Sequence, residues 1–325
     1  MPFSSVYHRR PSPRSRRLNA LAVLLGAGAL LAATGCSADT GASAKEPATS
    51  GKPKILAAFY PLEWISTRVG GSDVTITGLT QPGVEPHDLE LTPRQIADIE
   101  QADLIVYIKG VQPAVDDAVE EYAKDKAFDA ASTITPLAAA AEERNQEGGE
   151  AHEQVGYDPH IWLDPNRLAT TVTELGKRLG RIDGAHAAAY TGRANSAAGD
   201  LGTLDKDFQR GLTTCASHTI LTAHAAFGYL SDRYKLKQVG ISGLDPEAEP
   251  SPARIAEVAG IARQERVTTI FTEELVSPKV AEVLAKEVGA KTAVLNPIES
   301  RPKTGDYLSA ARTNLATLRT ALGCS

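Results

Sequence analysis

Short apolar runs alternate with amphipathic stretches in the first half of the chain. Two runs lie at residues 55–59 and 104–108, the second of which reads L-I-V-Y-I, and residues 74–79 alternate as expected of a further strand. One of the intervening helices opens at Thr92-Pro93, where threonine favours the N-cap and proline the first helical turn. Continuous apolar runs separated by helices predict a parallel sheet that is covered on both faces.

The same alternation returns in the second half of the chain. Strands are predicted at residues 219–221, 236–241, 268–272 and 293–295, with helices between them and a last helix from about residue 305. The two halves follow a similar order of elements, but they show no convincing sequence repeat. The pattern predicts an α/β fold of two lobes, each with a mainly parallel sheet flanked by helices.

Residues 166–211 separate the two halves and look almost wholly helical. The segment is rich in Ala, Leu and charged residues, and only Asp183-Gly184 interrupts it weakly. We therefore expect one long, rigid connector helix between an N-terminal lobe at residues 54–165 and a C-terminal lobe at residues 212–325. A chain of 325 residues is long enough for two such cores.

The first 35 residues have the pattern of a signal peptide. Five arginines and no acid precede residue 18, an apolar run covers residues 18–33, and small residues follow. The cysteine after A-T-G resembles the lipobox cysteine of bacterial lipoproteins, which implies that Cys36 is lipidated and becomes the mature N-terminus. A plain secreted protein is the alternative. Residues 36–53 are small and polar, with Pro and Gly among them, as expected of a flexible tether.

The mature chain is acidic. Removal of residues 1–35 changes the formal net charge from −6 to −11, because five arginines and no acids leave. Nucleic-acid binding depends on basic groups that neutralise phosphates. The charge therefore excludes nucleic acid as a partner.

The three cysteines are Cys36, Cys215 and Cys324. If lipid occupies Cys36, one pair remains, and a distant pair in an oxidising compartment predicts a disulfide between Cys215 and Cys324. A metal role is the minor alternative, since the two thiols lack C-x-x-C spacing. Met1, the one methionine, leaves with the signal peptide, so no thioether or free thiolate remains to select copper.

A stretch that reads D-P-H-I-W-L-D-P occupies residues 158–165, after a polar loop at residues 142–157. Each proline restricts both itself and the residue before it, so the backbone around His160 is held before tertiary contacts form. Asp164 and Pro165 then begin an amphipathic helix. A histidine held in this way is a candidate metal ligand, although a histidine beside a tryptophan is more often a packed or capping residue.

Two further histidines follow predicted strands in different halves of the chain. His87 lies in the loop after the strand at 74–79, and His224 lies just beyond the strand at 219–221. Ligands of parallel α/β sheets bind outside the carboxyl ends of the strands. The imidazoles of His87, His160 and His224, delivered to one crevice from fixed positions, suit a zinc ion.

The other histidines of the mature chain fit other roles. His218 precedes its strand and His186 lies on the connector, so both are expected to be structural or exposed. His152 lies in the acidic loop, which could gather metal weakly. A solvated acidic loop is the simpler description.

Four segments together resemble one protein family. The segments G-V-E-P-H-D-L-E-L-T-P, D-P-H-I-W-L-D-P, L-T-A-H-A-A-F-G-Y-L and V-L-N-P-I-E-S occur in the order and spacing seen in substrate-binding lipoproteins of bacterial zinc and manganese ABC importers. The resemblance covers residues 54–324. It implies two lobes bridged by one long helix, and a single divalent ion that is bound in the cleft and delivered to a membrane permease with its ATPase.

The resemblance also implies a ligand set. It makes His87, His160 and His224 metal ligands, and relatives that read L-N-P-[IL]-E close the coordination with the glutamate, which is Glu299 here. Water is the alternative fourth ligand. Glu273, at another strand end, is a reserve candidate whose other role is a helix cap or a lobe contact. Three imidazoles and one carboxylate favour one Zn²⁺ per chain over Mn²⁺, which prefers more oxygen donors.

The function implied is high-affinity zinc capture, without catalysis, by a monomer that a lipid anchors to the extracytoplasmic face of the bacterial cell membrane. Two alternatives stay open. A secreted zinc hydrolase would also use three protein ligands plus water, but the sequence has no H-E-x-x-H, G-x-S-x-G or phosphate-cradling glycine loop. An adhesin on the same scaffold would be marked by an exposed apolar patch.

Overall fold

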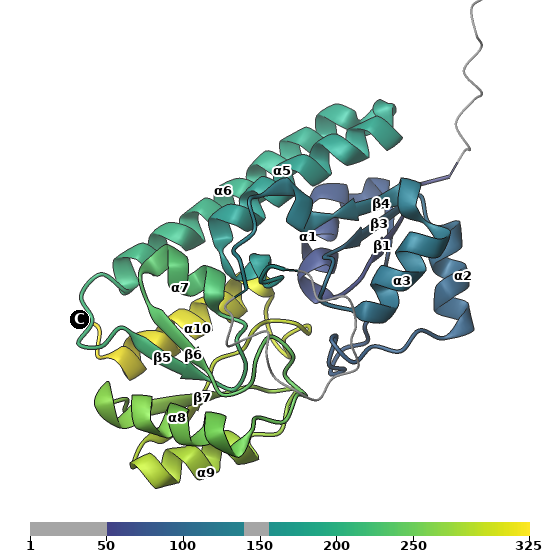
Figure 1. The fold of residues 1–325 in the computed structure, drawn as a ribbon. Coiled ribbons are helices and arrows are strands. Elements are labelled where there is room, and N and C mark those ends of the chain that lie inside the picture. The colour runs from purple at the N-terminus through teal and green to yellow at the C-terminus, as the bar shows by residue number, and fades with distance from the viewer. Residues whose placement is uncertain (1–50, 140–155) are drawn as a thin grey trace, which may run out of the picture. The chain divides into compact units, whose positions relative to one another are not determined.

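The first half of the chain forms a parallel sheet. The computed structural model describes residues 51–139 and 156–325 (Figure 1). The sheet has the order β2-β1-β3-β4, with β1 (Lys54–Ala57), β2 (Thr75–Gly78), β3 (Leu104–Tyr107) and β4 (Ala127–Asp129). Each neighbouring pair is parallel, and Ile55 of β1 lies opposite Ile76 on one side and Leu104 on the other.

The second half repeats this arrangement. Its sheet has the order β6-β5-β7-β8, with β5 (Thr219–Thr222), β6 (Lys237–Gly240), β7 (Thr269–Thr272) and β8 (Lys291–Val294), all parallel. The predicted α/β class with two parallel sheets is confirmed. The sequence does not predict β4, because its three residues, A-F-D, are only half-buried and form no apolar run.

Helices connect successive strands in both halves, and one more helix follows the last strand. They are α1 (Tyr60–Gly70), α2 (Pro93–Gln101) and α3 (Pro113–Tyr122) in the first half, and α7 (Gly228–Tyr234), α8 (Pro252–Gln264), α9 (Lys279–Val288) and α10 (Tyr307–Leu322) in the second. Thr92 caps α2 as predicted, because its side chain accepts a hydrogen bond from the backbone N–H of Gln95. The side chain of Ser251 accepts one from the backbone N–H of Arg254 in α8.

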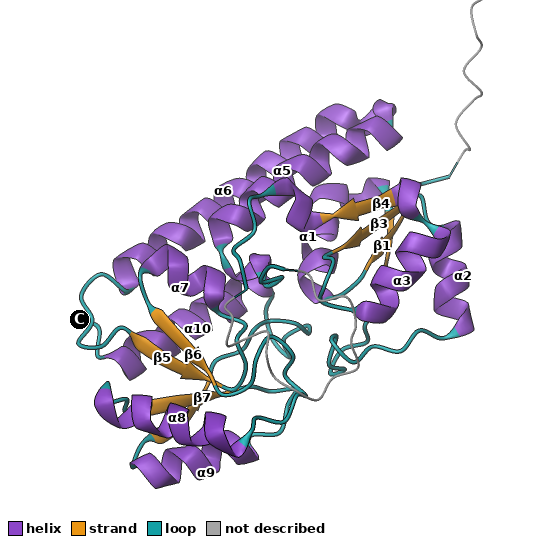
Figure 2. Cartoon of the chain, in the orientation of Figure 1, coloured by secondary structure: helices purple, strands orange, loops and turns teal. Residues whose placement is uncertain are grey.

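The second sheet lies between helices on both faces (Figure 2). Ile220 of β5 belongs to the apolar cluster that contains Leu318 of α10, whereas its neighbour Leu221 belongs to the cluster that contains Val258 of α8 and Leu284 of α9. Successive side chains of a strand point to opposite faces, so α10 covers one face while α8 and α9 cover the other.

Residues 166–211 form two helices, and the expectation of one connector helix is wrong in this respect. α5 (Pro165–Ile182) and α6 (Ala187–Gly211) lie side by side as a hairpin (Figure 1). The carboxylate of Asp183 holds the turn: it lies 2.7 Å from Nδ1 of His186 and accepts a hydrogen bond from the Tyr190 hydroxyl at 2.8 Å. The weak interruption at Asp183 is therefore a helix end.

Small residues let the two helices approach closely. A Cβ added at Gly176 of α5 would lie 2.7 Å from the Cβ of Ala194 in α6, and one added at Gly180 would lie 3.1 Å from the Cβ of Ala187. Any larger side chain at Gly176 would push the helices apart. Glycine is needed here for space, at some cost in helix propensity.

Side chains also tie the two halves of the chain to each other. The indole N–H of Trp64 in α1 donates to Asp306 at the start of α10 at 3.2 Å, and Glu63 forms an ion pair with Arg301 at 2.5 Å. α6 contacts both α1 and α10. One apolar cluster runs from β1 through the hairpin to α10, so the halves share a core.

The predicted disulfide between Cys215 and Cys324 is present. It joins the segment after α6 to the segment after α10, across 109 residues of sequence. Within residues 51–139 and 156–325, no helix has the length and apolar character needed to cross a membrane.

Candidate metal site

Four side chains converge where loops of the two halves meet. His87, His160, His224 and Glu299 each offer one ligand atom, and these atoms all lie within 4.8 Å of one another. His87 follows β2, His224 follows β5 and Glu299 follows β8, while His160 immediately precedes a short 3₁₀ turn (Ile161–Leu163) before α5. The Glu299 carboxylate lies 3.5 Å from Nε2 of His87 and 3.9 Å from Nε2 of both His160 and His224.

Asp158 fixes the ring of His160. One oxygen of its carboxylate accepts a hydrogen bond from the backbone N–H of His160 at 2.9 Å and lies 2.8 Å from Nδ1 of the ring. Because a carboxylate is an acceptor, Nδ1 carries the proton in this contact and Nε2 is left with its lone pair toward the cluster. The ring is fully buried.

Trp162 links the His160 segment to the loop that carries Glu299. Its indole N–H donates to the carbonyl of Pro297 at 2.6 Å inside the protein, and its ring centroid lies 5.1 Å from that of His160. The Tyr307 hydroxyl of α10 in turn donates to the carbonyl of Trp162. The segment at residues 158–165 is therefore held by residues from the second half of the chain.

Glu273 holds His224 as Asp158 holds His160. Nδ1 of His224 lies 2.8 Å from each oxygen of the Glu273 carboxylate, and the backbone N–H of His224 donates to the same carboxylate at 3.2 Å. Both side chains are buried. This arrangement again directs Nε2 of the imidazole to the cluster.

The loop of His87 is held by two contacts. The carboxylate of Glu85 accepts a hydrogen bond from the backbone N–H of His87 at 3.2 Å, and the backbone N–H of Gly83 donates to the Ser300 hydroxyl at 2.8 Å. Ser300 is the neighbour of Glu299, so the second contact joins two of the loops that form the cluster. Burial, together with the charge of Glu299, raises the pKa of Glu85 to about 7.

The ligand atoms of the cluster have no hydrogen-bond partner. The Nε2 atoms of His87, His160 and His224 and both carboxylate oxygens of Glu299 are buried and unpaired. A buried polar group without a partner is costly, and a buried carboxylate more so. A divalent cation among these atoms would satisfy all of them, so the residues fit a metal ion.

Burial and neighbouring charges shift the pKa values of the three histidines in different directions. Burial, together with the charges of the other two imidazoles, lowers the pKa of His160 well below its usual value. Burial also lowers the pKa of His224, but the carboxylate of Glu273 outweighs this effect and raises it to about 9. At His87 the Glu299 carboxylate, 3.5 Å from Nε2, likewise outweighs burial, so the pKa is raised. The ring of His160 is therefore neutral and ready to bind, whereas that of His224 must lose a proton first.

The fold brings together the residues that the sequence predicts as ligands, which are His87, His160, His224 and Glu299. That they bind a metal stays a prediction. The reserve candidate Glu273 lies outside the four-atom group and contacts His224 instead. His186 and His218 are exposed, as expected, and His152 and Cys36 lie outside the described residues.

Sequence reasoning does not identify Asp158 or Glu85 as functional residues. Asp158 stands two positions before His160 in a proline-bracketed stretch, and that spacing is the signal that could have found it. Glu85 also stands two positions before a histidine, His87, with a proline between them. In both cases the carboxylate accepts a hydrogen bond from the backbone N–H two residues on.

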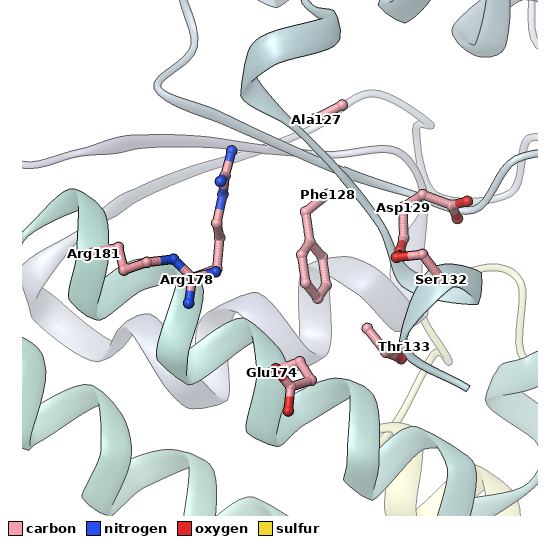
Figure 3. Close-up of a pocket in the computed structure, with 8 residues that line it drawn as sticks. All are labelled: Ala127, Phe128, Asp129, Ser132, Thr133, Glu174, Arg178 and Arg181. Atoms are coloured by element: carbon pink, nitrogen blue, oxygen red, sulfur yellow. The ribbon is translucent and has the colours of Figure 1, made fainter. Parts of the chain in front are cut away.

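A surface hollow of about 400 Å³ lies elsewhere on the first half of the chain (Figure 3). The ring of Phe128 stands between Arg178 of α5 and Thr133, and Glu174 and Arg181 complete the walls. None of the cluster residues lines this hollow, so it is no part of the candidate metal site.

Comparison with known proteins finds relatives that are named as bacterial zinc-binding proteins. A family model described as "Zinc-uptake complex component A periplasmic" matches residues 55–321. The "Zinc-binding lipoprotein AdcA" of Streptococcus pneumoniae is 33% identical over 300 residues, which cover 89% of this chain and 60% of that protein. The "High-affinity zinc uptake system protein ZnuA" of Bacillus subtilis is 32% identical over 316 residues, which cover 94% of this chain and 98% of that protein. This chain spans only 57% to 60% of the length of the streptococcal AdcA proteins that it matches.

A solved structure agrees with these matches. The laminin-binding protein Lmb of Streptococcus agalactiae, described as a bifunctional protein with adhesin and metal transporting activity, superposes with a TM-score of 0.74 at 31% identity. The match covers 84% of this chain and 100% of that one. Because the family model spans both sheets, the helical hairpin and all four cluster residues, the chain belongs to the family of periplasmic zinc-uptake complex component A.

Proposed function

We propose that the protein captures one zinc ion outside the cytoplasm and delivers it to an ABC-type importer. The observation that carries this proposal is the cluster of buried, unpaired ligand atoms on His87, His160, His224 and Glu299. Three imidazole nitrogens and one carboxylate oxygen suit tetrahedral zinc, whereas manganese prefers more oxygen donors.

The zinc is cargo, and its partners follow from the family. A periplasmic component of an uptake complex must meet a membrane permease, which an ATPase drives. We propose that the mature chain reaches this permease as a monomer, tethered by lipid at Cys36 on the extracytoplasmic face of the membrane. The lipoprotein name of the pneumococcal relative supports the anchor.

We also propose the lobe division at residues 54–165, 166–211 and 212–325. α6 contacts both α1 of the first half and α10 of the second, so the α5–α6 hairpin is a shared support for both lobes. Release of the ion then needs only a small closing and opening of the lobes with rearrangement of the loops.

Binding, and not catalysis, suits the geometry of the cluster. A catalytic zinc keeps one coordination position for water, and here Glu299 offers a fourth protein donor within 4.8 Å of the others. Adhesion, which the description of the S. agalactiae relative includes, is not favoured for this chain, because a closed, buried cluster has no evident part in it.

The test is zinc binding by the ion-free protein and by two histidine variants. We expect calorimetry to give one zinc per chain for the wild type, and His160→Ala to weaken the affinity by at least about tenfold. His218→Ala is the matched control, because His218 is exposed and lies outside the cluster. Wild-type protein that binds no zinc would remove the proposed function, and unchanged affinity in His160→Ala would remove that residue from the site.

A further inference from the structure

Glu85 is a carboxylate beside the cluster that the four-ligand set does not use. Its two oxygens differ: one accepts the hydrogen bond from the backbone N–H of His87, while the other, Oε2, is buried and has no partner. A carboxylate oxygen left unpaired inside a protein carries a desolvation cost. A transient interaction with a cation would offset that cost.

Glu85 lies beside the cluster on the loop of His87, where its other carboxylate oxygen accepts from the His87 backbone N–H. Its carboxylate also interacts electrostatically with Glu299, His87 and His224. Glu85 does not belong to the four residues whose ligand atoms lie within 4.8 Å of one another. It is therefore a neighbour of the site and not a fifth ligand of the bound ion.

His87 is the cluster residue nearest to solvent. The side chain of His87 is 9% exposed, whereas those of His160, His224 and Glu299 are at most 1% exposed. Glu85 itself is half-buried and stands two residues from His87 on the same loop. The loop of Glu85 and His87 is therefore the least buried part of the site, and an ion that enters there would meet these two residues before the inner ligands.

A hydrated zinc ion cannot exchange all its waters for four protein atoms at once. The first donor must stand on the solvent side, and a carboxylate is the protein group that best replaces water on a dication while offsetting its charge. We propose that Glu85 is this first donor: a transient ligand through its Oε2 atom, which takes the ion from water and passes it to His87 and Glu299. The proposal rests on the proposed function of the cluster as a zinc site.

A transient ligand has a kinetic signature. An interaction that is made only on the way in and out lowers the barrier in both directions, so its loss slows capture and release together and changes the dissociation constant less than either rate. A charge that only attracts the ion through space would change capture and affinity alike. A residue that only holds the loop would speed release when it is lost.

Glu85→Gln separates these possibilities. Glutamine keeps the size of the side chain and an oxygen that can accept from the backbone N–H of His87, but it removes the charge and the free carboxylate oxygen. The matched control is Glu90→Gln, which removes one charge from the exposed part of the same loop, where Glu90 has no hydrogen bond or ion pair among the described residues. Glu85→Asp restores a carboxylate on a shorter side chain.

The experiment is stopped-flow capture of Zn²⁺ in competition with a fluorescent zinc chelator, with release measured in excess EDTA, on the full mature chain. We expect Glu85→Gln to slow capture about tenfold, to slow release as well, and to retain one zinc per chain. Glu90→Gln should stay within about twofold of wild type in both rates, and Glu85→Asp should recover part of the capture rate.

Capture by Glu85→Gln at the wild-type rate would overturn the proposal, as would an affinity loss equal to the loss in capture rate with unchanged release. Faster release would assign Glu85 to loop structure alone and also overturn it. The proposed function is tested separately, because wild-type protein that binds no zinc removes both ideas, whereas zinc-loaded wild type with an unaffected Glu85→Gln removes only the role of Glu85.

Discussion

Both oxygens of the Glu273 carboxylate lie 2.8 Å from Nδ1 of His224, and both side chains are buried. A histidine whose Nδ1–H is committed to a carboxylate presents Nε2 as a fixed donor with raised basicity. The pairing of Asp158 with His160, also at 2.8 Å, has the same form. The candidate zinc site thus contains two carboxylate–imidazole pairs that lie behind the ligand atoms.

The first prediction concerns Glu273. Glu273→Gln keeps an oxygen that can accept from Nδ1–H, but it removes the negative charge that raises the basicity of His224. We expect the zinc affinity to fall about tenfold with one zinc still bound per chain, as measured by calorimetry. Glu274→Gln is the control, because Glu274 is exposed. Equal affinities of the two variants would show that Glu273 does not tune the site.

The second prediction concerns pH. In the ion-free protein the raised pKa of His224, about 9, keeps its ring protonated at pH 7, and the pKa of His87 is raised as well. Zinc must displace the protons on these rings, so its affinity should rise as the pH increases toward 9, by about tenfold per pH unit for each proton released. His160, whose pKa is lowered, contributes nothing in this range.

The proton count can be measured by calorimetry in buffers of different ionisation enthalpy at pH 7. We expect about one to two protons to leave per zinc bound. The pH dependence of the stability of the ion-free protein is opposite to that of the zinc affinity. The charged pair of His224 with Glu273 contributes fully to the free energy of unfolding below the usual histidine pKa of 6.5, and this contribution is lost as the pH rises through about 9. Zinc binding without proton release would contradict the assigned protonation.

The third prediction decides the fourth ligand. Glu299→Ala removes the carboxylate that lies 3.5 Å to 3.9 Å from the three Nε2 atoms, and water can take its place. We expect a loss of zinc affinity of about tenfold, milder than for His160→Ala, because three imidazoles remain. Affinity equal to that of wild type would assign the fourth position to water.

Sequence reasoning identified the three histidines of the cluster because each stands where a loop follows or precedes a regular element. His224 stands two residues beyond β5, and His160 is bracketed by prolines, so their positions follow from local rules. Glu299 came from the family resemblance alone. Its approach to His87 depends on how the two halves of the chain meet, which no local pattern contains.

Local sequence patterns could not predict the α5–α6 hairpin or the carboxylates that contact the histidines. The turn between α5 and α6 depends on Asp183 contacts with residues that lie up to seven positions later, and on close approach at Gly176, which is visible only in three dimensions. Glu273 and His224 are 49 residues apart, so their hydrogen bond follows from the parallel pairing of β5 with β7. The sequence could place Glu273 at a strand end but could not choose between ligand and partner of a ligand.

The fourth prediction concerns the disulfide between Cys215 and Cys324, which closes a sequence separation of 109 residues. The end of the chain is also held by hydrogen bonds from the Ser217 and Ser325 backbone N–H groups to the Leu322 and Thr214 carbonyls. Because these bonds survive reduction, we expect Cys324→Ser to lower the free energy of unfolding by only about 2–3 kcal/mol, measured by urea denaturation. Zinc stoichiometry should not change, since neither cysteine belongs to the cluster. Reductant should lower the free energy of unfolding of the wild type by the same amount and leave that of the variant unchanged. A variant as stable as the oxidised wild type would show that the hydrogen bonds alone hold the C-terminal end of the chain.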